Sequence, residues 1–267
     1  MAGKLDDWSL RSVPLRILCN NEHLADATGF FWTESDKTFL ITNWHVVTGR
    51  HPDTGKALSC FAPAEIAYPR FIEGESYSEV WWEKIQLRDE GGNATWFEHP
   101  VYSGSADVAA VLVPLHLPIE TSKGPQKSYV CTIDETSYHG EWAGRRLDMG
   151  SDLFVLGFPL GLKPTGHFPI WKRASVATEM DIPLNDKPAF LVDAATRQGM
   201  SGSPVVYVRN RDMHVLGGAV PTRYVEFVGV YSGRHVGGNE IEAQLGIVWK
   251  PEIIRDIVGC RKLGSPD

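Results

Sequence analysis

The sequence predicts an all-β protein made of two closed β units, with one α-helix near its C-terminal end. Apolar runs of strand length recur along the chain, and 26 glycines and 17 prolines divide it into many short segments. The runs fall into two successive sets of about half a dozen each. Because closing a sheet on itself removes exposed edges, two such sets favour two closed units.

The first predicted unit covers residues 11–118. Turn-forming residues separate its apolar runs, most clearly at Pro52–Gly55 and Asp89–Asn93. The expected strands of this unit lie at residues 13–18, 29–32, 38–42, 80–87 and 108–113.

From about Pro118 to Gly150 the chain is polar and irregular, as in Thr121–Gln126 and Ser137–Glu141, so residues 119–149 are predicted to be a linker. The second unit covers residues 150–260. Its expected strands lie at residues 153–157, 174–177, 189–192, 204–208, 226–231 and 245–249. Pro251–Val258 predicts the helix, because proline stands in its first turn and apolar residues follow at helical spacing.

Composition restricts the partners and the compartment. The net charge of −7 disfavours nucleic acid or an anionic membrane as the main partner, since both attract basic surfaces. The sequence contains neither a secretory signal pattern nor 18 consecutive apolar residues. Four scattered cysteines fit reduced core thiols better than disulfides or a zinc site. We therefore expect a cytoplasmic protein that does not bind membranes.

Three short motifs carry polar side chains of the kinds used in nucleophilic catalysis. Arg197–Val205 places Ser201 between glycines that permit a tight turn, where backbone N–H groups can point at a developing oxyanion. His45 follows a strand-like run, and Asp107 precedes another. Taken singly, each motif has a structural explanation: a surface turn, a packed histidine or a strand cap. A serine nucleophile, however, needs a base oriented by a carboxylate, and the chain contains both.

Together the motifs resemble those of the trypsin/chymotrypsin-like serine peptidases, and most closely the Deg/HtrA-type branch. They occur in that family's order, histidine, aspartate and then serine, within about residues 25–258. This order differs from that of the α/β-hydrolases, in which the serine comes first. The matching stretches are Thr42–Val47, Ala106–Ala109, Asp152–Gly161, Asp193–Pro204, Val228–Ser232 and Leu245–Val248.

The resemblance implies a fold of two six-stranded antiparallel β-barrels with the catalytic groups in the cleft between them. It implies that Ser201 is the nucleophile, although Ser203 stands two residues away. His45 is then the base, Asp107 orients it, and the N–H groups of Gly199 and Ser201 form the oxyanion hole. It also implies a polypeptide substrate, and neither a metal nor an organic cofactor.

The remaining implied residues bind the substrate. Ser232 supports the aspartate, and residues 232–234 pair with the substrate backbone. Ala195 and Thr196 lie at the base of the primary pocket and Gly246 on its wall; since none is charged, a small or apolar residue is expected before the cleaved bond. The full set of implied substrate-binding residues is Ala195, Thr196, Gln198, Ser232, Gly233, Arg234 and Gly246.

The chain also departs from the family pattern. Met200 stands where digestive relatives carry an aspartate that pairs with a freed amino terminus, so activation by that route is not expected. After the last helix we expect no peptide-binding PDZ domain. An alternative is a non-catalytic peptide-binding module, or a latent protease that a partner protein switches on by ordering the oxyanion loop. The sequence does not predict the oligomeric state.

Overall fold

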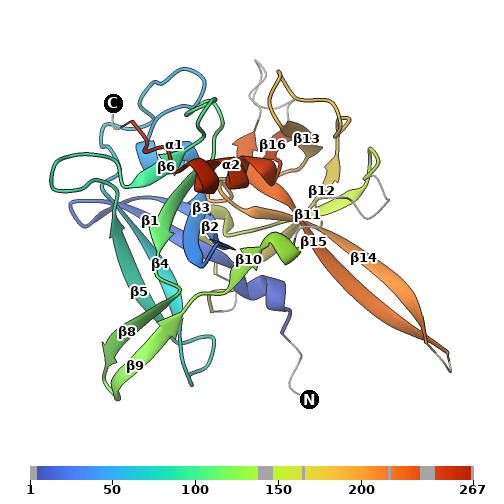
Figure 1. Ribbon diagram of the computed structural model, residues 1–267, viewed down its shortest axis with the longest axis horizontal. Helices are drawn as coiled ribbons and strands as arrows, with labels where there is room; N and C mark the ends of the chain where they lie inside the picture. The colour runs from blue at the N-terminus through green and yellow to red at the C-terminus, as the bar shows by residue number, and fades with distance from the viewer. Residues whose placement is uncertain (1–4, 138–146, 164–165, 216–217, 235–243, 266–267) are drawn as a thin grey trace.

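The computed structural model describes residues 5–137, 147–163, 166–215, 218–234 and 244–265 of the protein (Figure 1). Within these residues nearly all regular structure is β, as predicted. The strands form two units, an N-terminal sheet and a C-terminal barrel, joined through the segment between β10 and β11.

The N-terminal sheet has ten strands in the order β6-β7-β3-β2-β1-β4-β9-β8, with β5 paired to β4 and β10 paired to β2. All neighbours run antiparallel except β10, which runs parallel to β2. The strands are β1 (Ser12–Cys19), β2 (Glu22–Glu34), β3 (Lys37–Thr42), β4 (Glu65–Ile72), β5 (Val80–Gln86), β6 (Trp96–Glu98), β7 (Ala109–Val113), β8 (His116–Thr121), β9 (Gly124–Tyr129) and β10 (Thr132–Asp134).

The C-terminal unit is a closed six-stranded barrel in the order β11-β12-β13-β16-β15-β14. Two of its strands are long, and beyond the barrel they continue as a two-stranded ribbon that projects from the body of the molecule (Figure 1). The strands are β11 (Asp152–Gly157), β12 (Ile170–Val176), β13 (Ala189–Asp193), β14 (Pro204–Val215), β15 (Gly218–Arg234) and β16 (Leu245–Trp249).

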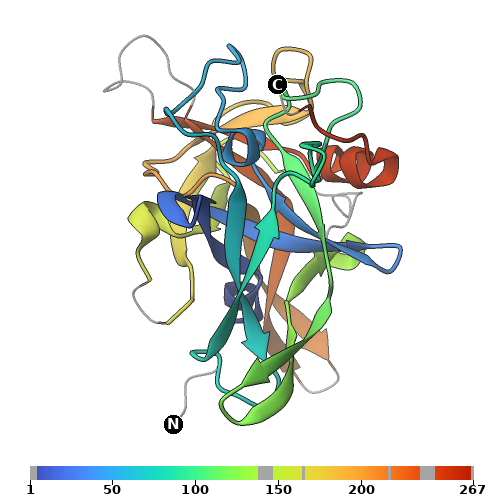
Figure 2. The same cartoon turned by 90° about the vertical axis from the view of Figure 1, so that its left-hand side faces the viewer.

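The expectation of two six-stranded barrels is therefore right for the second unit and wrong for the first, whose described strands form a larger sheet that is not closed. Much of the difference comes from the expected linker. Of residues 119–149, those from 119 to 134 lie largely in β8, β9 and β10, whereas residues 138–146 lie outside the described residues. Most side chains of the hairpin formed by β8 and β9 are at least partly exposed, with Ile119 and Ser128 as the buried ones, so the hairpin needs no apolar run. Figure 2 shows it at the lower edge of the sheet.

The described residues also form five short helical segments: η1 (Asp7–Leu10), α1 (Trp44–Thr48), η2 (Glu135–Ser137), η3 (Pro159–Gly161) and α2 (Glu252–Cys260). α2 confirms the predicted C-terminal helix. It starts after Pro251 and buries Ile253, Ile254, Ile257 and Val258. The helix contacts β6 and β7 of the N-terminal sheet, and its apolar face shares a core with residues of the barrel. No helix in the described part of the chain has the length and apolarity needed to span a membrane.

An apolar core joins the two units. Phe227 of β15 lies between two aromatic residues of β2, with its ring centroid 5.3 Å from Phe30 and 5.9 Å from Trp32. The same cluster contains Phe39 and Ile41 from the sheet and Val206 and Val230 from the barrel. Burial of this much apolar surface fixes the position of one unit on the other.

The N-terminal sheet also contains a buried cation. Arg70 of β4 is 0% exposed. Its guanidinium donates hydrogen bonds to the carbonyl oxygens of Pro114 and Leu115, both at 2.9 Å, and to the Ser128 hydroxyl at 2.9 Å. These acceptors belong to the entry into β8 and to β9, so Arg70 binds the hairpin to the rest of the sheet.

Candidate active site

His45 lies in the short helix α1, directly after the central strand β3. The chain leaves β3 through Asn43 in an extended conformation, forms a single helical turn and ends it at Gly49, which has φ 68°. Glycine adopts this left-handed conformation without strain. Val46 and Val47 are buried against the sheet, whereas the side chain of His45 is 21% exposed. The turn therefore directs the imidazole out of the core.

Asp107 lies just before β7, the strand beside β3, and its side chain is 3% exposed. Its Oδ1 accepts a hydrogen bond from the backbone N–H of His45 at 2.9 Å, and its Oδ2 lies 2.7 Å from His45 Nδ1. The Asn43 side-chain amide donates to the Asp107 carbonyl at 2.7 Å. An ionised carboxylate only accepts hydrogen bonds, so His45 carries a proton on Nδ1 and directs Nε2 away from Asp107.

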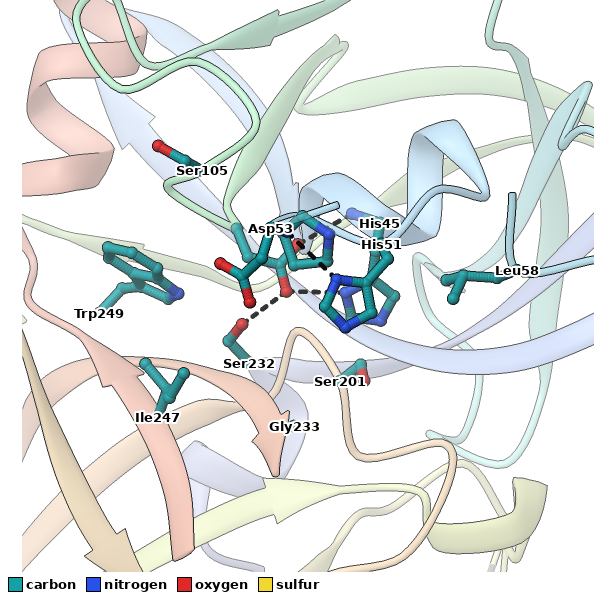
Figure 3. Close-up of a pocket in the computed structure, with 12 residues that line it drawn as sticks. His45, His51, Asp53, Leu58, Ser105, Ser201, Ser232, Gly233, Ile247 and Trp249 are labelled. Carbon is teal, nitrogen blue, oxygen red and sulfur yellow. Dashed lines mark hydrogen bonds and ion pairs between the residues drawn. The ribbon is translucent and has the colours of Figure 1, made fainter. Parts of the chain in front are cut away.

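Ser232 connects the barrel to this pair. Its hydroxyl donates to Asp107 Oδ2 at 2.5 Å (Figure 3). The Asp107 carboxylate thus accepts hydrogen bonds from both units, and its buried charge is satisfied.

The environment changes the pKa of His45. Burial lowers this pKa, because the charged imidazolium loses its hydration, but the negative charge of Asp107 and the hydrogen bond to it raise the pKa by more. The net result is a pKa above the ordinary value of 6.5. The site therefore stabilises the imidazolium that forms when His45 takes up a proton.

Ser201 reaches the same place from the barrel, on the loop between β13 and β14. Its carbonyl accepts the backbone N–H of Thr28 at 2.9 Å, and the next residue, Gly202, donates to the carbonyl of Tyr231 at 2.9 Å. Figure 3 shows Ser201 close to the imidazole of His45. Among the described residues, no hydrogen bond joins the two side chains, but both line the same two pockets.

The loop before Ser201 leaves two backbone N–H groups available. Gly199 has φ 90°, and its carbonyl accepts the Thr28 hydroxyl at 2.6 Å. The Gln198 carbonyl accepts the Leu160 N–H at 2.7 Å and is therefore turned away from Ser201. Within the described chain, the N–H groups of Gly199 and Ser201 donate to no protein acceptor. Two unpaired donors on either side of Met200 can bind a carbonyl oxygen that becomes negatively charged.

The structure distinguishes between the two candidate serines. Ser203 is 0% exposed, and its hydroxyl lies against Gly157, so it cannot meet a substrate. Ser201 is partly exposed and lines both pockets. Met200 is buried in the core of the barrel.

The predicted substrate-binding residues separate into two groups. Ser232 and Gly233 line one pocket beside Ser201, Gln198 lines the other, and Arg234 pairs with Gly246 between β15 and β16. By contrast, Ala195 is exposed, Thr196 and Gly246 are buried, and none of these three lines either pocket.

Sequence reasoning missed several residues of the site. Thr28 binds the Ser201 loop, Asn43 binds the Asp107 backbone, and Leu58 lines both pockets. His51 lines one pocket together with His45. Of these residues, only Leu58 could have been found from the sequence, because it is an apolar side chain in a polar, turn-rich segment. The others are ordinary polar residues whose role depends on the fold.

Comparison with known proteins places this geometry in context. The family model described as a trypsin-like peptidase domain matches residues 27–217. No curated protein matches the chain. Among solved structures, the serine endoprotease from Yersinia pestis is 13% identical with a TM-score of 0.49, and the match covers 94% of this chain and 62% of that one. Protease Anisep from Arthrobacter nicotinovorans is 11% identical with a TM-score of 0.49, and the match covers 94% of each chain. The chain thus spans less than two thirds of the length of the Yersinia protein.

Proposed function

The chain belongs to the trypsin-like peptidase domain family, and on that premise we propose that it is a serine endopeptidase with His45, Asp107 and Ser201 as its catalytic triad. The observation that carries the proposal is the buried carboxylate of Asp107, which lies 2.7 Å from His45 Nδ1 and leaves Nε2 to serve Ser201 in the shared pockets.

The proposed reaction proceeds through an acyl-enzyme. Ser201 Oγ attacks the carbonyl carbon of the scissile peptide bond while His45 Nε2 takes the hydroxyl proton. The negative charge of Asp107 stabilises the resulting imidazolium. His45 then gives the proton to the leaving amine, and a water molecule, activated in the same way, hydrolyses the ester.

The oxyanion of each tetrahedral intermediate is proposed to bind to the N–H groups of Gly199 and Ser201. Removing one such donor typically lowers kcat by about 10²–10³-fold. The orientation of the Gln198 and Gly199 carbonyls, which bind Leu160 and Thr28, supports an oxyanion loop that is already in the conformation required for catalysis.

The substrate is proposed to be a polypeptide bound along Ser232, Gly233 and Arg234, with a small or apolar residue before the cleaved bond. The pocket that Gln198 lines, of about 690 Å³, would hold residues after that bond. The other pocket, of about 300 Å³ and lined by Ile247 and Trp249, would hold residues before it.

A second candidate function is a binding module or a latent protease that needs a partner. The absence of a hydrogen bond between Ser201 and His45 among the described residues favours it. Such bonds are often long in a protease without substrate and tighten when substrate binds, so this observation does not outweigh the rest of the site.

Labelling with a fluorophosphonate probe, which reacts only with an activated serine, tests the proposal. We expect the wild type to be labelled, Ser201→Ala to be unlabelled and Ser203→Ala to remain labelled, because Ser203 is buried. If the folded wild type does not react in the absence of a partner, the result would support the binding module or the latent state. Labelling of Ser201→Ala would contradict the assignment of the nucleophile.

A further inference from the structure

Tyr231 lies where the residues of the expected primary pocket converge. It immediately precedes Ser232 on β15 and is 1% exposed. Its hydroxyl is hydrogen-bonded to the Thr196 hydroxyl. Its ring lies against Gly246: a Cβ placed there would overlap the ring and lie 2.8 Å from its hydroxyl oxygen. One aromatic side chain thus contacts both the expected base and the expected wall of that pocket.

The backbone holds Tyr231 next to the nucleophile. Its N–H donates to the Ser203 carbonyl at 2.9 Å, and its carbonyl accepts the Gly202 N–H at 2.9 Å. Its strand neighbour on the other side is Val248 of β16. The side chain therefore starts from a hydrogen-bonded strand beside Ser201 and reaches Thr196, to which its hydroxyl is hydrogen-bonded.

The open space around Ser201 lies elsewhere. The two pockets that His45 and Ser201 share are bordered by Ile247 and Trp249 in one case and by Leu160 and Gln198 in the other. Neither is lined by Ala195, Thr196, Gly246 or Tyr231. In a closely packed interior, volume that an aromatic ring occupies is not available to another side chain.

We propose that Tyr231 fills the primary pocket from within and restricts the residue before the cleaved bond to glycine, alanine or serine. This inference rests on the proposed endopeptidase function and narrows its substrate class. A side chain with more than two heavy atoms beyond Cα would need the space of the buried ring, which packs against Gly246 and is hydrogen-bonded to Thr196. Tyr231 is then a specificity-determining residue and lies on the same strand as Ser232.

Peptides that differ only in the residue before the cleaved bond test the proposal, with Tyr231→Ala and Tyr231→Phe as matched variants. We expect the wild type to cleave after alanine and at least about 100-fold less efficiently after phenylalanine. In Tyr231→Ala, kcat/KM for the phenylalanine peptide should rise about 100-fold, the scale of pocket discrimination between apolar side chains. Tyr231→Phe keeps the ring and should keep the wild-type preference.

Phenol binding by calorimetry separates this inference from the proposed function, because it needs no catalysis. We expect Tyr231→Ala to bind phenol, whose ring and hydroxyl replace those of the lost side chain, and the wild type not to bind it. If Tyr231→Ala does not fold, Tyr231→Val replaces it in the experiment. This variant opens a smaller space, so we expect cleavage to extend to valine and not to phenylalanine.

The outcomes are distinct. Absence of fluorophosphonate labelling in folded wild type defeats the endopeptidase proposal, whereas phenol binding to Tyr231→Ala still supports the filled pocket. Efficient wild-type cleavage after phenylalanine, leucine or lysine overturns the inference. A folded Tyr231→Ala protein that neither binds phenol nor changes preference overturns it as well.

Discussion

The two halves of the molecule hold their parts of the site in different ways. In the N-terminal half, His45 and Asp107 are fixed to each other by the His45 N–H, the imidazole and Asn43, and the barrel adds only the Ser232 hydroxyl. In the C-terminal barrel, Ser201 and Gly199 are held by Thr28, which belongs to β2 of the other half. The base and its carboxylate form a local unit, whereas the geometry of the nucleophile depends on how the halves pack. Disturbing either support should therefore have different consequences.

We expect the largest effect from a change in the His45–Asp107 pair. Asp107→Asn keeps the shape but removes the charge and presents an amide that can donate to His45 Nδ1, so the imidazole is held in the wrong tautomer. We expect kcat to fall about 10⁴-fold with little change in folding. Steady-state kinetics on a cleaved peptide measures the effect. Asp36→Asn makes the same change in an exposed residue of the turn between β2 and β3 and should stay within about threefold of wild type. Equal losses in the two variants would contradict the assigned role of Asp107.

We expect the next largest effect from a change in the loop that carries Gly199 and Ser201. In Gly199→Ala, the new Cβ would overlap the Phe158 carbonyl at a φ of 90°, so the loop must shift and misplace an oxyanion donor. We expect kcat to fall about 10²–10³-fold and the free energy of unfolding to fall by about 1–3 kcal/mol. Kinetics and urea unfolding measure these quantities. Gly124→Ala is the matched control, since Gly124 has φ 100° in open space at the start of β9. Full activity in Gly199→Ala would show that the loop carries no oxyanion donor.

We expect a smaller effect from a change at Thr28, which joins the two halves. The Thr28 hydroxyl donates to the Gly199 carbonyl and accepts the Phe158 N–H at 3.1 Å, so Thr28→Val leaves both groups unpaired. We expect a stability loss of about 1–3 kcal/mol and kcat lowered about tenfold. Thr38→Val removes a similarly buried hydroxyl within the N-terminal sheet and should lower stability without lowering kcat. If both variants have wild-type kcat, the nucleophile does not depend on the packing of the halves.

The smallest expected effect is a shift in the pH dependence of kcat/KM. His45 acts as a base only when neutral, and its pKa is raised, so the acid limb of kcat/KM should have its midpoint above pH 6.5. Asp107→Asn removes the charge that raises this pKa, so the limb of its residual activity should move to lower pH. The sign for stability is opposite: the His45–Asp107 attraction should stabilise the fold below pH 6.5 and be lost as pH rises through the raised pKa. A wild-type midpoint at or below 6.5 would refute the coupling.

The sequence predicted the barrel better than the sheet for a physical reason. Strands of the closed barrel carry apolar runs because their inner faces meet in a core, as in Leu153 and Val155 of β11. The hairpin formed by β8 and β9 is largely exposed, so its sequence resembles that of a linker, although every residue of each strand is paired with the other strand. Strand β4 was missed because Pro69 and Arg70 interrupt its apolar pattern.

For the candidate site, motifs identified the groups but could not predict what fills the space between them. His45, Asp107 and Ser201 stand in recognisable local contexts, and the structure brings them to one place. The obstruction by Tyr231 could not be predicted, because it requires residues at 196, 231 and 246 to meet. In the sequence, Tyr231 is simply an aromatic residue in a strand.

Arg70 sets a limit on how this protein can be divided. A fragment that ended before residue 114 would retain the strands around His45 and Asp107, but it would lose the oxygens of Pro114, Leu115 and Ser128 that solvate the guanidinium. A cation without acceptors in an apolar interior costs several kcal/mol, comparable with the whole stability of a small domain. A split reporter or a transplanted module built from the N-terminal half must therefore extend through β9, which ends at Tyr129.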